Sequence, residues 1–214
     1  MKKIIVLVYS IVGIYFFCFA ETPLIVIDPL HGGKDTGGYY INNKTKKTVY
    51  EKDIVLALAK KIEAELKERY PQIQTIMTRS DDSDMTFSDR EEKIQATTQN
   101  HQTICLRLHI NSSTDTSSTG FKLLIPEPAS TLGMSLAQYL TKSLDQTIGS
   151  YMQNRGIGLL QATNLSNSNK VHIFIGIGCL SNQKDMNLLL DNTFLVQCSE
   201  GIVTGIKNYI DSLS

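Results

Sequence analysis

The sequence predicts one α/β domain built around a mostly parallel β-sheet. Past residue 20, apolar runs of strand length alternate with longer stretches whose apolar residues recur at helical spacing, and this alternation is typical of repeated strand–helix units. The chain has 214 residues, a length that fits a single domain with one core. The sequence shows no internal repeat and no long low-complexity segment. We therefore expect residues 21–214 to form one domain.

The first half of the domain alternates strands and helices. Residues 24–27 form the first strand-length run, and a Gly-rich, Lys-rich loop follows up to Tyr50. Apolar residues then recur at helical spacing over residues 54–66, and Pro71 closes this helix. The elements expected next are a strand over 73–78, a helix over 88–99 and a strand over 104–110.

The second half begins with a polar, turn-forming stretch at residues 111–119. The elements expected after it are strands over 120–125, 158–163 and 171–177 and helices over 131–148 and 193–210. In open α/β sheets, ligands bind outside the carboxyl ends of the strands, where loops converge. We therefore look for chemistry at those ends.

The first twenty residues differ from the rest. Lys2 and Lys3 precede an apolar stretch over residues 4–20 that ends in the small residue Ala20, which is the pattern of a signal peptide. An uncleaved membrane anchor is the alternative, although a spanning helix needs about 20 apolar residues and this run is slightly short. Residues 1–20 therefore predict an exported protein of the periplasm or cell envelope.

Charge and cysteine content narrow the class of protein. The chain has 21 Lys and Arg against 21 Asp and Glu, so it lacks the basic excess of a nucleic-acid-binding protein. Cys105, Cys179 and Cys198 form no CxxC pair, and we expect them to be buried core residues. One disulfide stays open as an alternative in an oxidising compartment.

Three residues that can bind metal fall at the expected strand and helix ends. His31 follows the first strand, Glu51 begins the long helix, and His109 ends the strand over 104–110. Two imidazoles and one carboxylate are a catalytic zinc set, because they leave a fourth position for water. Each residue also has a simpler explanation: the histidines could bond to backbone, and Glu51 could be a favourable acid in the first turn of a helix.

Local motifs favour the metal hypothesis. Residues 25–35, IVIDPLHGGKD, resemble the opening motif of the zinc-dependent N-acetylmuramoyl-L-alanine amidases of the amidase-3 type. Residues 51–59, EKDIVLALA, are similar to the second metal motif of that family, and residues 108–112, LHINS, resemble the third. The resemblance continues in order to the final helix, which ends at Tyr209. It thus covers nearly all of residues 21–214.

This resemblance implies a fold, a cofactor and a substrate. The fold is a three-layer α/β/α domain, with helices on both faces of a twisted sheet. The cofactor is one Zn²⁺ ion held by His31, Glu51 and His109. The substrate and partner is peptidoglycan, in which family members cut the amide between N-acetylmuramic acid and the L-alanine of the stem peptide. A glutamate on the last strand serves as general base and then acid.

The chain departs from the family pattern at that glutamate. Gly176 occupies its position, and glycine cannot accept a proton. A positioned acid or base contributes about 10²- to 10⁴-fold to the reaction rate, so an otherwise intact site with glycine here is expected to be slow or silent. We assign no catalytic residue. Two hypotheses follow: a zinc amidase with another base, or an impaired amidase-like module that binds peptidoglycan or regulates other enzymes. A metal-free structural domain is a third, and a protein activator is left open.

Three further residues lie near this position. Arg107 shares a strand face with His109 by period-2 alternation, so it either pairs with an acid or holds a substrate carboxylate. Asn111 either lines the substrate groove or caps a loop. His172 shares the Gly176 face as a candidate replacement base, but it lies two pleats away, roughly 7 Å along the strand.

Overall fold

The computed structural model describes residues 22–42, 45–98, 101–161, 165 and 170–213. The expected signal segment at residues 1–20 lies outside them. Within these ranges no helix is both long and apolar enough to span a membrane.

The elements in chain order are β1 (Leu24–Pro29), β2 (Tyr39–Ile41), β3 (Thr48–Tyr50), α1 (Glu51–Arg69), β4 (Thr75–Met77), α2 (Phe87–Thr98), β5 (Thr103–Asn111), β6 (Phe121–Pro126), α3 (Thr131–Ile148), β7 (Asn154–Leu160), β8 (Lys170–Cys179), α4 (Gln183–Leu189) and α5 (Asn192–Asp211).

The main sheet has six strands in the order β4-β1-β5-β8-β6-β7. Strands β4, β1, β5 and β8 are parallel to one another, β6 is antiparallel to β8, and β7 is parallel to β6. The sheet is therefore mostly parallel, as the alternation of strands and helices predicts. Because β6 runs in the opposite direction, it begins at the edge where β5 and β8 end.

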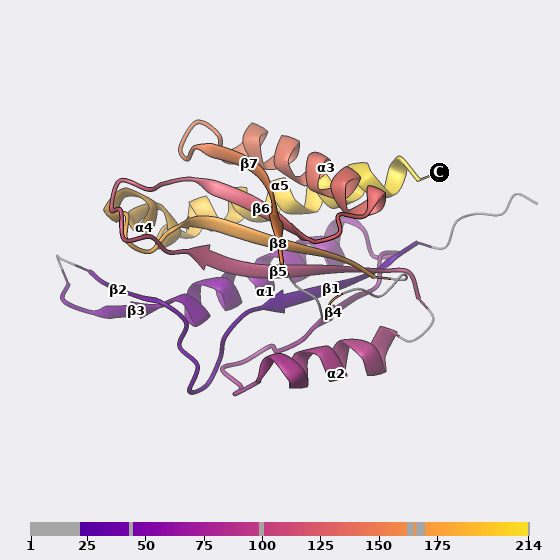
Figure 1. Cartoon of the computed structure of the whole chain (residues 1–214), viewed down its shortest axis with the longest axis horizontal. Helices are drawn as coiled ribbons and strands as arrows, with labels where there is room; N and C mark the ends of the chain where they lie inside the picture. The colour runs from indigo at the N-terminus through magenta and orange to yellow at the C-terminus, as the bar shows by residue number, and fades with distance from the viewer. Residues whose placement is uncertain (1–21, 43–44, 99–100, 162–164, 166–169, 214) are drawn as a thin grey trace, which may run out of the picture.

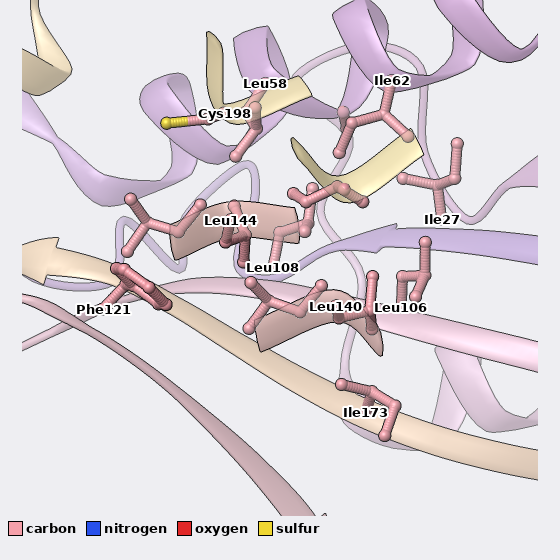
Figure 2. Close-up of a cluster of buried hydrophobic side chains, with 14 of the residues drawn as sticks. Ile27, Leu58, Ile62, Leu106, Leu108, Phe121, Leu140, Leu144, Ile173 and Cys198 are labelled. Carbon is pink, nitrogen blue, oxygen red and sulfur yellow. The ribbon is translucent and has the colours of Figure 1, made fainter. Parts of the chain in front are cut away.

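Helices cover both faces of the sheet, which confirms the three-layer prediction. Helices α1, α3 and α5 lie on one face, and α2 lies apart from them below β1 and β4 in Figure 1. The larger core fills the first interface, where Leu106 and Leu108 of β5 meet Leu140 and Leu144 of α3 (Figure 2). A smaller cluster of Val26, Ile94 and Cys105 lies under α2. Alternate residues of one strand thus enter different layers.

Most predicted elements are confirmed within a few residues, and three elements are additional: the strands β2 and β3 and the helix α4. The short helix α4 begins after Asn182, whose side chain accepts hydrogen bonds from the backbone N–H groups of Lys184 and Asp185. The hairpin of β2 and β3 lies in the stretch expected to be a loop. Its strands have three residues each, too few for alternation to be visible in sequence. The weak strand expected over 158–163 lies earlier, at Asn154–Leu160.

All three cysteines of the described domain are free and buried, as predicted. Burial raises the pKa of the Cys105 thiol to about 12 and also raises that of Cys198. Thiols that stay protonated in this way are poor nucleophiles. Cys105 and Cys198 are therefore packing residues.

Two glycines let α3 and α5 approach closely. A Cβ atom at Gly205 would lie 2.8 Å from Leu140 Cα, and one at Gly201 would lie 3.1 Å from Leu144 Cα. Both contacts are with backbone atoms, which cannot rotate away. The packing of these two helices therefore depends on the missing side chains.

We predict that Gly205→Val destabilises the fold by about 1–3 kcal/mol, because the added atoms overpack the interface between α3 and α5. Urea unfolding followed by circular dichroism measures the free energy of unfolding. Thr204→Val, at the half-buried neighbouring position, is the matched control and should change it little. An equal loss in both variants would contradict the close-packing argument.

Candidate metal centre

His31 lies in a tight loop that orients its ring. The residue follows β1 and has a positive φ of 64°, and the loop closes through backbone hydrogen bonds between Gly32 and Asp35. His31 Nδ1 lies 2.9 Å from Asp35 Oδ2, and Nε2 lies 3.4 Å from Glu51 Oε1. A carboxylate behind one ring nitrogen is the usual support for a histidine that binds metal through the other.

Glu51 joins three parts of the chain. It is the first residue of α1 and only 5% exposed. Its Oε2 accepts a hydrogen bond from Gly38 N–H at 2.9 Å, and its Oε1 accepts one from Ile110 N–H at 2.8 Å. The pKa of this carboxyl is lowered overall. Burial raises it, but the hydrogen bonds from His31, Ile110 and Gly38 lower it by more. Glu51 is therefore more than a favourable acid at a helix start.

The loop backbone at Gly37 closes over both side chains. Gly37 has a φ of 63°, and a Cβ atom there would lie 2.6 Å from His31 Cδ2 and 2.8 Å from Glu51 Oε2. Only glycine fits this position without displacing the pair. Residues 31–38 thus form a cradle around the two predicted ligands.

His109 lies beside this pair. The next residue, Ile110, donates its N–H to Glu51, and the charges of Glu51 and His31 both act on the His109 imidazole. Burial is the main influence on that ring and lowers its pKa, so His109 is neutral and can offer a lone pair. Among the described residues, however, no three His, Cys, Asp or Glu side chains are arranged so that they could hold a metal ion.

A buried charge network lies behind the His31 loop. Asp28 is fully buried, and its Oδ1 accepts hydrogen bonds from Thr78 Oγ1 at 2.5 Å and Arg90 Nη1 at 2.6 Å. Its Oδ2 accepts one from Arg107 Nη1 at 2.9 Å. Arg107 also pairs with Glu91 of α2. The network therefore ties β1, α2 and β5 together.

Arg79 and Arg90 extend this network to the loop that carries His31. Arg79 donates to the carbonyl oxygens of Pro29 and Leu30 at 3.0 and 3.1 Å. Arg90 donates to Pro29 O at 3.0 Å and also to the carbonyl of His31 itself. Three consecutive carbonyl groups are thus held by two guanidinium groups. This arrangement fixes the backbone of the loop in its left-handed turn.

Arg107 does not reach the surface of the site. It is 0% exposed, and its guanidinium is occupied by Asp28 and Glu91 and packs near the rings of Phe87 and Phe174. A substrate carboxylate would have to displace an existing ion pair to bind there. Of the two sequence interpretations, the structure favours pairing with an acid and corrects the substrate-binding one.

His172 belongs to the same network and not to the site. Its Nδ1 lies 3.4 Å from Arg107 Nη2, and the strand register places it beside Cys105, four residues before Gly176. Burial, with the positive charge of Arg107, lowers the pKa of His172 to about 3. The structure therefore does not support His172 as a replacement base.

Gly176 lies beside His109 in the sheet. The two residues are register partners on β8 and β5, so a side chain at position 176 would share the face of His109. A Cβ atom there would lie 2.5 Å from Asn111 Oδ1 and 2.8 Å from Nδ2, and Asn111 Nδ2 donates to Gly178 O at 3.0 Å. The carboxamide of Asn111 therefore occupies the space that a side chain at 176 would need.

Sequence reasoning did not predict this placement of Asn111. The β5–β8 register shifts between His109 and Asn111, where Asn111 pairs with Cys179. Such an irregularity has no signal in the alternation of residues 104–110. Asn111 was expected in the groove or as a loop cap, and the structure places it half-buried at the strand end over Gly176.

Comparison with known proteins finds amidases among those that the chain resembles. The model of the family described as N-acetylmuramoyl-L-alanine amidase matches residues 25–208. A curated relative, the probable cell wall amidase LytH of Staphylococcus aureus, is 26% identical over 196 residues. That match covers 88% of this chain and 58% of the relative. The chain thus spans little more than half of the curated relatives that it matches.

Solved structures share the whole fold. An N-acetylmuramoyl-L-alanine amidase from Clostridium difficile 630 superposes with a TM-score of 0.80 at 26% identity, covering 91% of this chain and 100% of that one. The catalytic domain of CwlV, an N-acetylmuramoyl-L-alanine amidase from Bacillus (Paenibacillus) polymyxa, gives 0.76 at 28% identity, covering 88% and 98%. The chain therefore has the fold of known amidase domains.

The buried His172 predicts an acid-sensitive fold. Its ordinary pKa is about 6.5 and its folded pKa is about 3, so between these values the unfolded chain binds a proton that the folded chain does not. Stability must therefore fall as the pH falls through this window. We expect a loss of about 2 kcal/mol from this residue between pH 7 and pH 5.

The measurement is urea unfolding at several pH values for the wild type and His172→Gln. Glutamine keeps an acceptor for Arg107 but does not titrate, so the variant should lose less stability as the pH falls. The same substitution at the exposed His101 is the control. Identical pH profiles for wild type and His172→Gln would refute the prediction.

Proposed function

Because the chain belongs to the N-acetylmuramoyl-L-alanine amidase family, we propose that it binds peptidoglycan and cleaves the amide between N-acetylmuramic acid and the L-alanine of the stem peptide. The observation that carries this proposal is the convergence of His31 and Glu51 at the carboxyl edge of the sheet, with Nε2 and Oε1 3.4 Å apart. Both residues come from family-type motifs that are separate in sequence.

One Zn²⁺ ion is the proposed cofactor, with His31, Glu51 and His109 as its ligands. Asp35 supports the ring of His31 from behind, and the Gly37 cradle holds His31 against Glu51. The two imidazoles and the carboxylate are a donor set that suits zinc. Two of the three donors, on His31 and Glu51, lie 3.4 Å apart, and His109 is the proposed third.

Zinc at this position would polarise the scissile carbonyl and increase the acidity of water. Orientation of the ligands and proton transfer depend on residues of this chain. The hydrogen bond to Asp35 fixes which nitrogen of His31 faces the site, and backbone N–H groups hold both oxygens of Glu51 in place. At Gly176 no side chain can take up or return the proton that amide hydrolysis moves. Asn111 beside it can hydrogen-bond but cannot act as a base.

The first test measures metal binding and cleavage together. Isothermal titration should give one Zn²⁺ per wild-type chain and none for His109→Ala. Asp35→Asn should weaken zinc binding about 10- to 100-fold, because it removes the support of His31. Release of labelled fragments from purified peptidoglycan should require zinc and should fall to background in His109→Ala. The exposed His101→Ala is the matched control.

An absence of stoichiometric zinc in the wild type would reject the ligand set. Equal fragment release by wild type and His109→Ala would reject metal-dependent amidase activity. Zinc binding without any fragment release would favour the second candidate function.

That second candidate is a peptidoglycan-binding or regulatory module with impaired catalysis. The observation that favours it is Gly176, together with the Asn111 carboxamide that fills the adjacent space. A chain that keeps ligands and groove but lacks a proton acceptor would bind stem peptides and turn them over slowly. Retention on insoluble peptidoglycan, with and without chelator, measures that binding directly.

We predict that restoring the acid requires two substitutions. Gly176→Glu alone should give little gain in amidase activity, because Asn111 occupies the space of the new side chain. Gly176→Glu combined with Asn111→Ala should raise the rate of fragment release by about 10²- to 10⁴-fold, the usual contribution of a general base. Asn111→Ala alone and Gly176→Gln with Asn111→Ala are the controls, since neither adds a proton acceptor.

If the double variant with glutamate is no faster than the one with glutamine, the missing carboxylate is not what limits the reaction. A gain equal in both would instead indicate that removal of Asn111 opens the groove.

The proposed location is outside the cytoplasm, in the periplasm or cell envelope. The support is the Lys2-Lys3 pair followed by the apolar residues 4–20, together with relatives described as cell wall amidases. Residues 1–20 would act there either as a cleaved signal peptide or as a membrane anchor. A protein activator in the same compartment is a further proposal.

A further inference from the structure

A polar cavity with two cations lies next to the candidate metal centre. It encloses about 240 Å³ between the ends of β5 and β8 and the start of β6. Its lining includes Asn111, Ser112, Ser113, Thr119, Lys122 and Arg155. None of the described residues that line it carries a carboxylate. Lys122 and Arg155 are not among the proposed zinc ligands, and neither occupies the position of the general base.

Lys122 is placed there by the direction of β6. This strand is antiparallel to β8, and Lys122 pairs with Gly176 in the register, while Gly176 pairs with His109. The three positions therefore form one row across β5, β8 and β6 on the same face of the sheet. A lysine thus stands directly beside the position from which the family's glutamate is absent.

The side chain of Lys122 is part of the cavity lining, and its end lies against Gly158 of β7. A Cβ atom at Gly158 of β7 would lie 2.8 Å from its Cε and 3.1 Å from its Nζ, so the absence of a side chain there leaves room for the ammonium. Lys122 is half-buried, and its ammonium has no ion pair or hydrogen bond with any other described residue. A partly desolvated cation without a partner favours an anionic ligand.

Arg155 supplies the second positive charge. It is exposed, and its Nη1 donates to Thr119 O in a long hydrogen bond of 3.5 Å, so most of its N–H groups remain available. Its charge also acts on Asp115, whose carboxylate accepts hydrogen bonds from the backbone N–H and hydroxyl of Ser117. Arg155 therefore offers a guanidinium that can pair with a carboxylate at two atoms.

Asp185 is the buried acid behind this cavity, and its carboxylate is already saturated. It accepts hydrogen bonds from Thr119 Oγ1 at 2.5 Å and from the N–H groups of Gly120 and Cys179 at 3.0 Å each. These bonds join the start of β6 to the end of β8 and shape the wall. Neither Asp185 nor Asp115 is among the residues that line the cavity, so the charged groups that face it are Lys122 and Arg155.

We propose that Lys122 and Arg155 form a subsite for a carboxylate of the peptidoglycan stem peptide. The cavity shares Asn111 with the candidate centre, where that side chain contacts the Gly176 position, so a peptide whose scissile amide lies at the centre can extend into it. The volume suits one carboxylate-bearing side chain. The assignment rests on the proposed function, and it makes the chain selective for stems with free carboxylates over amidated stems.

The test compares two small probes that differ only in charge. N-acetyl-L-alanyl-D-glutamate and its diamide are titrated into ¹⁵N-labelled full-length protein, and the backbone amide signals of residues 111–122 are followed. The carboxylate form should shift them and should bind roughly ten-fold more tightly than the diamide, because charge-assisted bonds to both cations are lost in the diamide. Added salt should weaken only the charged probe.

Variants locate the effect. Lys122→Gln and Arg155→Gln should each remove most of the preference for the carboxylate. Lys170→Gln is the matched control, because Lys170 is also half-buried in the sheet but lies at the opposite end of β8, and it should retain the preference. Lys122→Gln with an unchanged preference would overturn the subsite.

Two further results are decisive in different ways. Inorganic phosphate that binds as tightly as the dipeptide and shifts the same signals would overturn the assignment to a carboxylate, since a wall phosphate would then fit equally well. Retention on whole peptidoglycan without any carboxylate preference would overturn the subsite and leave the proposed function standing. A clear preference in the dipeptide titration without retention on peptidoglycan would support the subsite and count against the proposed function.

Discussion

The carboxylate of Asp28 is the buried interaction on which the candidate site depends. A charge without solvent is costly unless it is paired and hydrogen-bonded, and Asp28 is bound by Thr78, Arg90 and Arg107 together. Arg90 then uses its remaining N–H groups on the carbonyls of the next loop residues. The charge network therefore determines the path of the backbone exactly where His31 must take a positive φ.

The site lies at one edge of the sheet, where the loop after β1, the start of α1 and the end of β5 meet. His31, Glu51 and His109 come from three different parts of the chain. His31 Nδ1 lies against Asp35 of its own loop, and the carboxylate of Glu51 accepts hydrogen bonds from the N–H groups of Gly38 and Ile110. The antiparallel strand β6 closes the same edge from the other side. The His31–Glu51 pair, a strand end and the cavity lined by Lys122 and Arg155 consequently adjoin one another without belonging to one stretch of sequence.

The residues that would bind a metal and a peptide differ from the position that would transfer a proton, which is Gly176. The features that would hold a metal and a peptide lie in a cradle, a charge network and a cavity, and all of them are built from several residues. Under the proposed function, the transfer of a proton would depend on a single side chain, at the position that Gly176 occupies. A single change at one strand position can thus remove catalysis and leave recognition, because the two rest on different numbers of contacts.

The sequence by itself determined the layers, the strand and helix order, the motif positions of His31, Glu51 and His109, and the shared faces of Arg107, His172 and Gly176. Those properties follow from local periodicity and from residue types within a few positions of each other. Only the tertiary structure decided the partners. Arg107 meets Asp28 across 79 residues of sequence, Asn111 covers Gly176 through an irregular register, and Lys122 joins that row because β6 reverses direction. Such contacts depend on how strands are ordered and aligned in space. The residues that neighbour Arg107, Asn111 and Lys122 in the sequence therefore do not indicate their partners.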